Sequence, residues 1–421
     1  MRSIHTKLCF GLVCLLFYAC QTEQASNVIN PEEVVEVLQK KLIEATPGTI
    51  IELPEGTFDF QRSISLNDTP DITIKGAGKG KTVLSFKNQI QGAEGMLIKN
   101  VKGITLEGFT IADSKGDAIK VQGCENVIMR DLETTWTNGQ LATNGAYGLY
   151  PVSSTNVLME KCEASYAMDA GIYVGQSTNV VVRDNYVHHN VAGLEIENTI
   201  AGEVYNNIAK NNTGGMLIFD MPDLPQANGD RIKFYNNTME GNNGKNFAPK
   251  GMVVSTIPPG SGMIIMSHSN IEAYNNTITN HKTLGIAVNS WLFTGVPFES
   301  PEFDPYCTNI YLHDNNISGN QGPTDTSTDF GQLFTAVNGG EPVDIVIDGI
   351  FKPTTLDDSG RPTGYCFTNN GENISFINLN AALGGSPEEM MKNKSTDISP
   401  FDCTLDAFDT SEHDQWLAVN E

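Results

Sequence analysis

Side chains that can move protons recur in a series of similar short strings between residues 117 and 220. Lys120, Tyr173 and Glu195 each directly follow an aliphatic residue, and they are the candidate catalytic residues. Lysine or tyrosine would act as a general base, with Glu195 as the acid partner. Because successive side chains of a strand point to opposite faces, the three would share one outward face. The spacing therefore predicts a proton-transfer site on the outside of a sheet.

Polar and aromatic side chains flank these three candidates in the same strings. Aromatic rings next to amides and carboxylates suit sugars, whose ring faces are apolar and whose rims carry hydroxyls. Tyrosines and opposite charges also stack across strands without any ligand, so ordinary solvated side chains are the alternative interpretation. The candidate substrate-binding residues are Tyr150, Gln176, Glu197, Asn198 and Asp220.

A calcium site is a further possibility at the same place. Glu195 and Glu197 lie two residues apart on one strand face, and with Asp220 they offer the oxygen ligands that Ca²⁺ takes. No Cys or Cys/His spacing is typical of a zinc site. The predicted site therefore includes no assigned metal ligand.

The element that must position these residues is a repeat. An apolar strand followed by asparagine recurs, with the asparagines separated by 22, 30, 39 and 39 residues. A unit of about 22 residues with several short strands and Gly/Asn turns is one coil of a parallel β-helix. Stacked coils would align these asparagines in an inward, structural ladder. Its members are Asn185, Asn207, Asn237, Asn276 and Asn315.

The repeat predicts one all-β solenoid domain over residues 31–385, with long loops in its C-terminal half. Asn30, Pro31 and the acids behind them are typical of a helix start, and this helix should cap the first coil. A polar tail, residues 386–421, should pack on the last coils. The long loops are residues 137–145, 222–229, 244–262 and 291–308.

The first residues are typical of an export signal. A basic start precedes a short apolar run that ends at Ala19, so residues 1–19 form a predicted signal peptide. The string ending in Cys20 resembles a bacterial lipobox, which would make Cys20 a lipidated residue followed by a tether, residues 20–30. We expect an exported protein anchored by lipid to the cell envelope, periplasmic or at the outer membrane. Secretion without lipid and the choice of membrane leaflet stay open.

Composition restricts the partners. The chain has 421 residues, with 26 basic against 50 acidic side chains and a net charge of −24. This charge excludes a general nucleic-acid binder and weighs against a polyanionic substrate. We expect a monomer that touches a membrane only through its anchor. One disulfide is expected among Cys307, Cys366 and Cys403, with the pair undecided.

Several strings resemble a family of exported right-handed parallel β-helix repeat proteins. They are residues 169–177, 190–198, 212–220 and 246–250. The resemblance implies a single-stranded right-handed parallel β-helix and export, but no reaction. More distantly, the chain is similar in architecture to pectate lyases, alginate lyases and mannuronan epimerases, and architecture alone does not assign function.

Two functions therefore compete. The first is a protein that binds or processes polysaccharide along the outer face; as an enzyme it would be a lyase or epimerase, or a glycosidase. The second is a non-catalytic periplasmic scaffold that docks an exported partner protein or assists a metalloenzyme.

Overall fold

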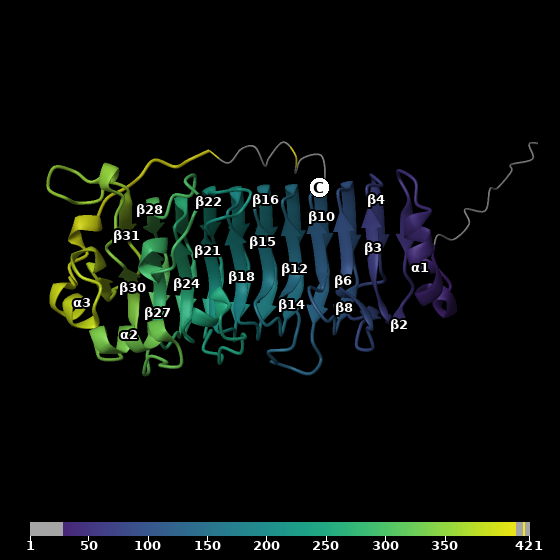
Figure 1. The fold of residues 1–421 in the computed structure, drawn as a ribbon, viewed down its shortest axis with the longest axis horizontal. Coiled ribbons are helices and arrows are strands. Elements are labelled where there is room, and N and C mark those ends of the chain that lie inside the picture. Colours follow the sequence, from purple (N-terminus) through teal and green to yellow (C-terminus); the bar gives the residue numbers. More distant parts are fainter. Residues whose placement is uncertain (1–27, 410–415, 417–421) are drawn as a thin grey trace, which may run out of the picture.

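The computed structural model describes residues 28–409 and Trp416 (Figure 1). The predicted signal peptide, the predicted lipidation site Cys20 and most of the predicted tether lie outside these residues. Within the described part, no helix is long and apolar enough to cross a membrane.

Three parallel sheets wind along the chain as a right-handed parallel β-helix, which confirms the predicted fold. Each coil contributes one strand to each sheet in the order A, B, C, except the last, which has no strand in sheet B. Sheet A contains β1 (Ile50–Glu52), β4 (Ile72–Lys75), β7 (Lys102–Glu107), β10 (Glu125–Arg130), β13 (Thr155–Glu160), β16 (Thr178–Arg183), β19 (Ile200–Tyr205), β22 (Asp230–Tyr235), β25 (Ser269–Tyr274), β28 (Thr308–His313) and β31 (Tyr365–Thr368).

Sheet B is built from the shortest strands. It contains β2 (Gly56–Asp59), β5 (Thr82–Ser85), β8 (Thr110–Ala112), β11 (Glu133–Thr135), β14 (Glu163–Ser165), β17 (Tyr186–His188), β20 (Ile208–Lys210), β23 (Thr238–Glu240), β26 (Thr277–Thr279) and β29 (Asn316–Ser318).

Sheet C faces the viewer in Figure 1. It contains β3 (Arg62–Asn67), β6 (Gln91–Lys99), β9 (Ile119–Gln122), β12 (Tyr147–Val152), β15 (Ala170–Gly175), β18 (Ala192–Glu197), β21 (Gly214–Phe219), β24 (Ser261–Met266), β27 (Leu284–Asn289), β30 (Val343–Ile347) and β32 (Phe376–Asn378).

A helix caps the first coil as predicted. The 3-10 turn η1 (Pro31–Glu33) starts at Asn30, whose side chain accepts the Glu32 backbone N–H, and leads into α1 (Val34–Ile43). The buried side of α1 packs on the first coil through Val34, Leu38 and Leu42. Packing begins earlier than the predicted boundary at residue 31, because Val28 pairs with Glu52 and Ile29 is buried.

The asparagine ladder exists where it was predicted, at the turns between sheets A and B. Asn207 shows the pattern: its Nδ2 donates to Asn237 Oδ1 at 3.0 Å and to the Val182 carbonyl at 2.9 Å. Its Oδ1 accepts from Asn185 Nδ2 at 2.9 Å. A second ladder, which was not predicted, lies between sheets B and C and contains Asn190, Asn212 and Asn242. These bonds satisfy backbone groups at the buried bends.

Loop length distinguishes sheet C from the other two sheets. From β7 to β29, every turn from sheet A to sheet B contains two residues. The long connections instead enter or leave sheet C, so they border its outer face on both sides. Those that enter are residues 136–146, 241–260 and 319–342; those that leave are residues 220–229, 290–307 and 348–364. They include the short helices η2 (Val253–Thr256), η3 (Trp291–Thr294) and η4 (Pro353–Thr355) and the helix α2 (Asp329–Asn338).

The C-terminal segment, as far as the structure describes it, packs on the last coils through a short helix. Helix α3 (Pro387–Asn393) packs with α2 over the end of sheet C, and the turns η5 (Ala381–Leu383) and η6 (Ser399–Phe401) flank it. Cys403 forms a disulfide with Cys366, which leaves Cys307 as a free buried cysteine.

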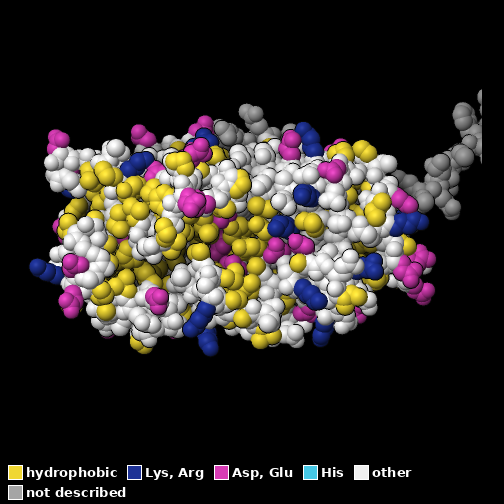
Figure 2. Space-filling view, viewed as in Figure 1, with side chains coloured by type: hydrophobic (Ala, Val, Ile, Leu, Met, Phe, Trp, Pro, Cys, Tyr) yellow, Lys and Arg dark blue, Asp and Glu magenta, His cyan; other side chains and the backbone are white. Residues whose placement is uncertain are grey.

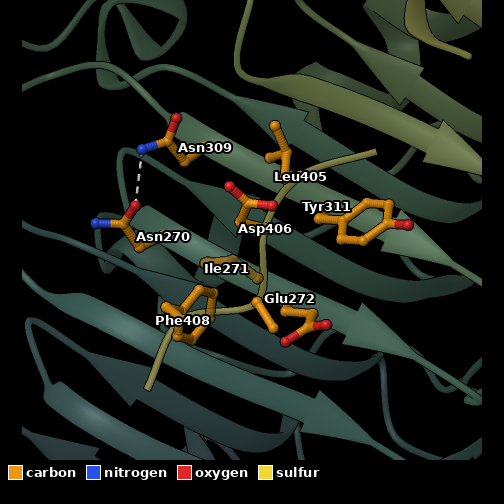
Figure 3. A pocket seen from close by; sticks show the side chains of 9 residues that line it. Asn270, Ile271, Glu272, Asn309, Tyr311, Leu405, Asp406 and Phe408 are labelled. Atoms are coloured by element: carbon orange, nitrogen blue, oxygen red, sulfur yellow. Dashed lines mark hydrogen bonds between the residues drawn. The ribbon is translucent and has the colours of Figure 1, made fainter. Parts of the chain in front are cut away.

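Beyond this disulfide the chain turns back across sheet A (Figure 1). Phe408 there lies 5.9 Å from Lys233 Nζ. The segment encloses a cavity of about 260 Å³ (Figure 3). Its lining residues are Asn270, Ile271, Glu272, Asn309, Tyr311, Leu405, Asp406, Ala407 and Phe408.

Candidate functional site

The three predicted catalytic residues lie on one outward face of sheet C. In the strand register Lys120 pairs with Tyr150, and Tyr173 pairs with Glu195. Tyr150 and Tyr173 come from adjacent strands, with ring centroids 5.0 Å apart. Since the neighbours of these residues in the chain, such as Leu149 and Ile172, fill the interior, the predicted alternation holds here.

A third tyrosine completes an aromatic cluster on this face. The Tyr147 ring centroid lies 4.6 Å from that of Tyr150 and 4.3 Å from that of Tyr173. Lys120 Nζ lies 4.7 Å from the Tyr150 ring centroid and 3.9 Å from an Asp117 carboxylate oxygen. We call Tyr147, Tyr150 and Tyr173 the tyrosine cluster. It forms an aromatic surface with one cation at its edge.

Carboxyl groups with raised pKa values surround the tyrosine cluster. Burial raises the pKa of Asp169 to about 7, although a hydrogen bond donated by Tyr147 opposes the shift. Burial likewise raises the pKa of Asp117 to about 6 against the attraction of Lys120. The pKa of Glu195 is raised well above its ordinary value by burial and by the neighbouring Asp169 and Glu197 carboxyls. Glu195 therefore keeps its proton near neutral pH, Asp169 is partly protonated there, and Asp117 is mostly ionised, so the group contains both proton donors and an acceptor.

Glu197 is held within the same cluster. Its carboxylate accepts a hydrogen bond from the Tyr173 hydroxyl, and Gln176 Nε2 lies 3.5 Å from its Oε2. The pKa of Tyr173 is raised well above its ordinary value by burial and by Glu197, so the hydroxyl retains its proton. This favours Tyr173 as a hydrogen-bond donor rather than the base suggested by its sequence position.

The structure places Asn198 and Asp220 in the turn beside the sheet rather than with the tyrosine cluster. Asn198 Nδ2 donates to the backbone carbonyls of Met221, Gln226 and Ala227, so it fixes the loop of residues 220–229. Asp220 accepts the Gly229 N–H at 2.7 Å, and its other oxygen lies 3.8 Å from the fully buried His268. These contacts give both residues a structural role at the rim.

The donors do not combine into a calcium site. Over residues 28–409 and Trp416, no group of three or more His, Cys, Asp and Glu side chains is arranged to hold a metal. Burial raises the pKa of Glu195, Glu197 and Asp220, with that of Asp220 at about 6. Calcium requires ionised oxygens, so raised pKa values do not favour it.

The carboxyl groups are not solvated side chains of an open sheet. Glu195 and Glu197 are each 3% exposed. The loop of residues 241–260 covers the adjoining strand, where Val254 and Ile257 pack with Leu217 and Phe219. Figure 2 shows apolar side chains gathered along this face, with acidic side chains among them near the middle. The alternative of plain solvation is therefore wrong for these two glutamates.

Sequence reasoning missed Asp117, Tyr147 and Asp169, all at or just before a strand start. At the start of β12 the side chains do not alternate strictly, because positions 148 and 149 (Gly148 and Leu149) both face the interior. A Cβ on Gly148 would lie 2.4 Å from Thr134 Oγ1, a side chain of sheet B. Tyr147 could have been found by extending the strand alignment backwards: Leu149 pairs with Ile172, so Tyr147, two residues earlier, pairs with Ala170.

Comparison with known proteins agrees with this architecture. Residues 72–223 match the sequence description of a right handed beta helix region. The pre-neck appendage protein of Bacillus phage phi29 is 28% identical over 223 residues, which cover 45% of this chain and 26% of the phage protein. This chain thus spans about a quarter of the length of that relative.

Three solved structures are similar to this chain at low identity, each with a TM-score below 0.5. The mannuronan C-5 epimerase AlgE4 A-module of Azotobacter vinelandii is 12% identical, with a TM-score of 0.48 over 81% of this chain and 90% of that one. Endopolygalacturonase I from Stereum purpureum is 13% identical, with a TM-score of 0.45 over 70% and 94%. An alginate lyase from Paenibacillus is 16% identical, with a TM-score of 0.41 over 68% and 91%.

Proposed function

We propose that the outer face of sheet C binds a carbohydrate chain and hydrolyses it by general acid–base catalysis. The observation that carries this proposal is the tyrosine cluster packed among carboxyls with raised pKa values. The half-buried rings of Tyr147 and Tyr150, held against the buried ring of Tyr173 with centroids within 5.0 Å, offer apolar surface for a sugar ring. The carboxyls beside them supply hydrogen-bond partners for hydroxyls and a proton for the leaving group.

The two aspartates suit the two roles that glycoside hydrolysis requires. Asp169, with a pKa of about 7, keeps its proton and donates it to the glycosidic oxygen as the C–O bond breaks. Asp117, with a pKa of about 6 and Lys120 beside it, is ionised at neutral pH and accepts a proton from the attacking water. The water oxygen bonds to the sugar carbon, and the two proton transfers balance.

A neutral glycan fits this face better than a uronic-acid polymer. The net charge of −24 repels a polyanion, and four acids line the site against the single cation Lys120. Hydrolysis of a neutral chain also needs no cation opposite a substrate carboxylate, which a lyase or epimerase of uronic acids would need. This favours the glycosidase among the enzyme classes predicted from sequence.

The test is to incubate the mature protein with neutral and uronic-acid glycans, and to measure affinity, new reducing ends and unsaturated products. The substitution Tyr150→Ala should weaken glycan binding roughly tenfold or more, because it removes an aromatic contact surface. Tyr186→Ala on sheet B is the matched control and should leave binding unchanged. Failure to bind any glycan would contradict the proposal, and co-purification of a stoichiometric exported protein would favour the scaffold function.

We also propose export and anchoring through Cys20, on the strength of the signal-like run and the lipobox-like string that precede it. In bacteria expressing the full chain, a labelled fatty acid should be incorporated into the wild type and not into Cys20→Ser. Incorporation into both would contradict anchoring at this residue.

A further inference from the structure

The outward side chains of sheet C change character along the solenoid. One register position can be followed from strand to strand through the whole sheet, from β3 to β32. It is polar or mixed at the N-terminal end, aromatic and acidic in the middle, and apolar towards the C-terminal end. In order, its residues are Ser65, Leu97, Lys120, Tyr150, Tyr173, Glu195, Leu217, Ile264, Ala287, Val346 and Ile377.

Most of the C-terminal part of this row is covered by protein, although Ile264 is half-buried. Immediately beyond Glu195, Leu217 is 6% exposed because Val254 and Ile257 from the loop of residues 241–260 pack with it. Further along, Ala287 and Val346 are 1% and 0% exposed, in one cluster with α2 and α3. A chain lying along the face could not pass Glu195 in this direction without displacing that loop.

The N-terminal part of the row is accessible. Leu97, Lys120, Gln122 and Tyr150 are all partly exposed. The connections that leave sheet C here contain few residues, such as residues 100–101 after β6 and 123–124 after β9. Nothing comparable to the loop of residues 241–260 covers these described strands, so this side of the tyrosine cluster is open to a long ligand.

We infer that the site takes the end of a neutral glycan chain rather than its middle. The chain lies over β6, β9 and β12, and its terminal sugar rests on the half-buried rings of Tyr147 and Tyr150. These rings pack against the buried cluster that contains Tyr173, Val254 and Ile257, which forms the wall. This inference rests on the proposed function, and it adds the direction and the chain position at which the protein acts. The released product would be one or a few sugars taken repeatedly from one end.

The buried glutamates fit recognition of a chain end. A terminal sugar has one more free hydroxyl than an internal sugar, at the position where the next residue would attach. Glu195 and Glu197 lie beside Tyr173, on the side where the row becomes covered. Raised pKa values leave these carboxyls able to donate as well as accept a hydrogen bond, which suits a hydroxyl.

The experiment measures binding capacity against chain length. Soluble xylan, mannan and β-glucan are each shortened in steps by partial acid hydrolysis, and protein bound at saturation is measured per gram of glycan. For a chain-end site, capacity should rise in proportion to the number of chain ends. Capacity that does not depend on chain length would overturn the inference while leaving the proposed function intact. No binding to any glycan would overturn both.

A variant tests the direction of the chain. Leu97→Trp narrows the open side and should weaken binding of a hexasaccharide roughly tenfold, while leaving a disaccharide unaffected, because only the longer ligand reaches β6. Thr105→Trp, at a half-buried position of sheet A, is the matched control for the added indole. Equal affinity of Leu97→Trp and the wild type for the hexasaccharide would overturn the proposed direction.

Discussion

The rings of Tyr147 and Tyr173, from neighbouring coils, lie with centroids 4.3 Å apart, and each hydroxyl donates a hydrogen bond to a different carboxyl group. Tyr147 donates to Asp169, and Tyr173 donates to Glu197. The pair thus builds an aromatic surface and, at the same time, positions two carboxyls. This double use explains how one face of a sheet can offer both sugar contact and proton transfer.

Tyr147→Phe should raise the pKa of Asp169 further above about 7, because the lost hydrogen bond is one that favours the ionised carboxylate. Carbon-13 NMR of aspartate carboxyls titrated against pH measures the shift directly. Tyr186→Phe on sheet B removes an equivalent hydroxyl away from Asp169 and should not move this resonance. An unchanged or lowered Asp169 pKa in Tyr147→Phe would contradict the assigned bond.

Asp169→Asn should change how stability depends on pH. The folded protein holds the Asp169 proton with a pKa of about 7, whereas an unfolded aspartate has a pKa of about 3.9. Asp169 therefore stabilises the fold fully below pH ~4, and this contribution is lost as pH rises through about 7. Denaturant midpoints measured from pH 4 to pH 8 should fall less steeply in Asp169→Asn than in the wild type.

Asp68→Asn serves as the control for that series, since Asp68 is an exposed turn residue. Its pH dependence should match that of the wild type. Parallel curves for Asp169→Asn and the wild type would show that Asp169 is not the group that titrates.

Asn207→Ala should destabilise the solenoid by about 3 kcal/mol or more, because it removes hydrogen-bond partners from several buried polar groups. The Val182 carbonyl would lose its side-chain donor, and Asn237 Oδ1 would keep only the Asn207 backbone N–H. The backbone N–H and Nδ2 of Asn185 would both lose Asn207 Oδ1 as an acceptor. Chemical denaturation measures the loss. Asn316→Ala, at an exposed position, should change stability by no more than ~0.5 kcal/mol, and equal losses would argue against the ladder as a stabilising element.

The double variant Cys366→Ser/Cys403→Ser should release the C-terminal segment from sheet A. The disulfide closes a loop of 37 residues, and opening a loop of this size costs about 4 kcal/mol of stability. Hydrogen exchange of residues 404–409 should speed up, while exchange near Tyr147 should not. Wild type treated with a reducing agent should behave like the double variant, and unchanged exchange in both would mean that other contacts hold the segment.

The fold could be predicted from the sequence because the repeated asparagines occupy the same position in successive coils. Asn207 and its equivalents must lie at a buried bend in each coil, so their spacing reveals the coil length. The second ladder, between sheets B and C, was not predicted at Asn242 and His281, because histidine follows asparagine there and interrupts the asparagine repeat. The disulfide pair could not be chosen from the sequence, since the path of the chain after α3 decides which cysteines meet.

For the site, the sequence determined which side chains leave the core, and the tertiary structure decided what surrounds them. Alternation alone placed Lys120, Tyr173 and Glu195 on one face, since it follows from strand geometry. Burial of Glu195 required the loop of residues 241–260 to fold over its neighbours, and no local pattern encodes that contact. The raised pKa values of Asp117 and Asp169 also depend on tertiary burial, because desolvation is set by everything packed around a group. Sequence thus gives the residues of this face, whereas packing of distant loops gives them their chemistry.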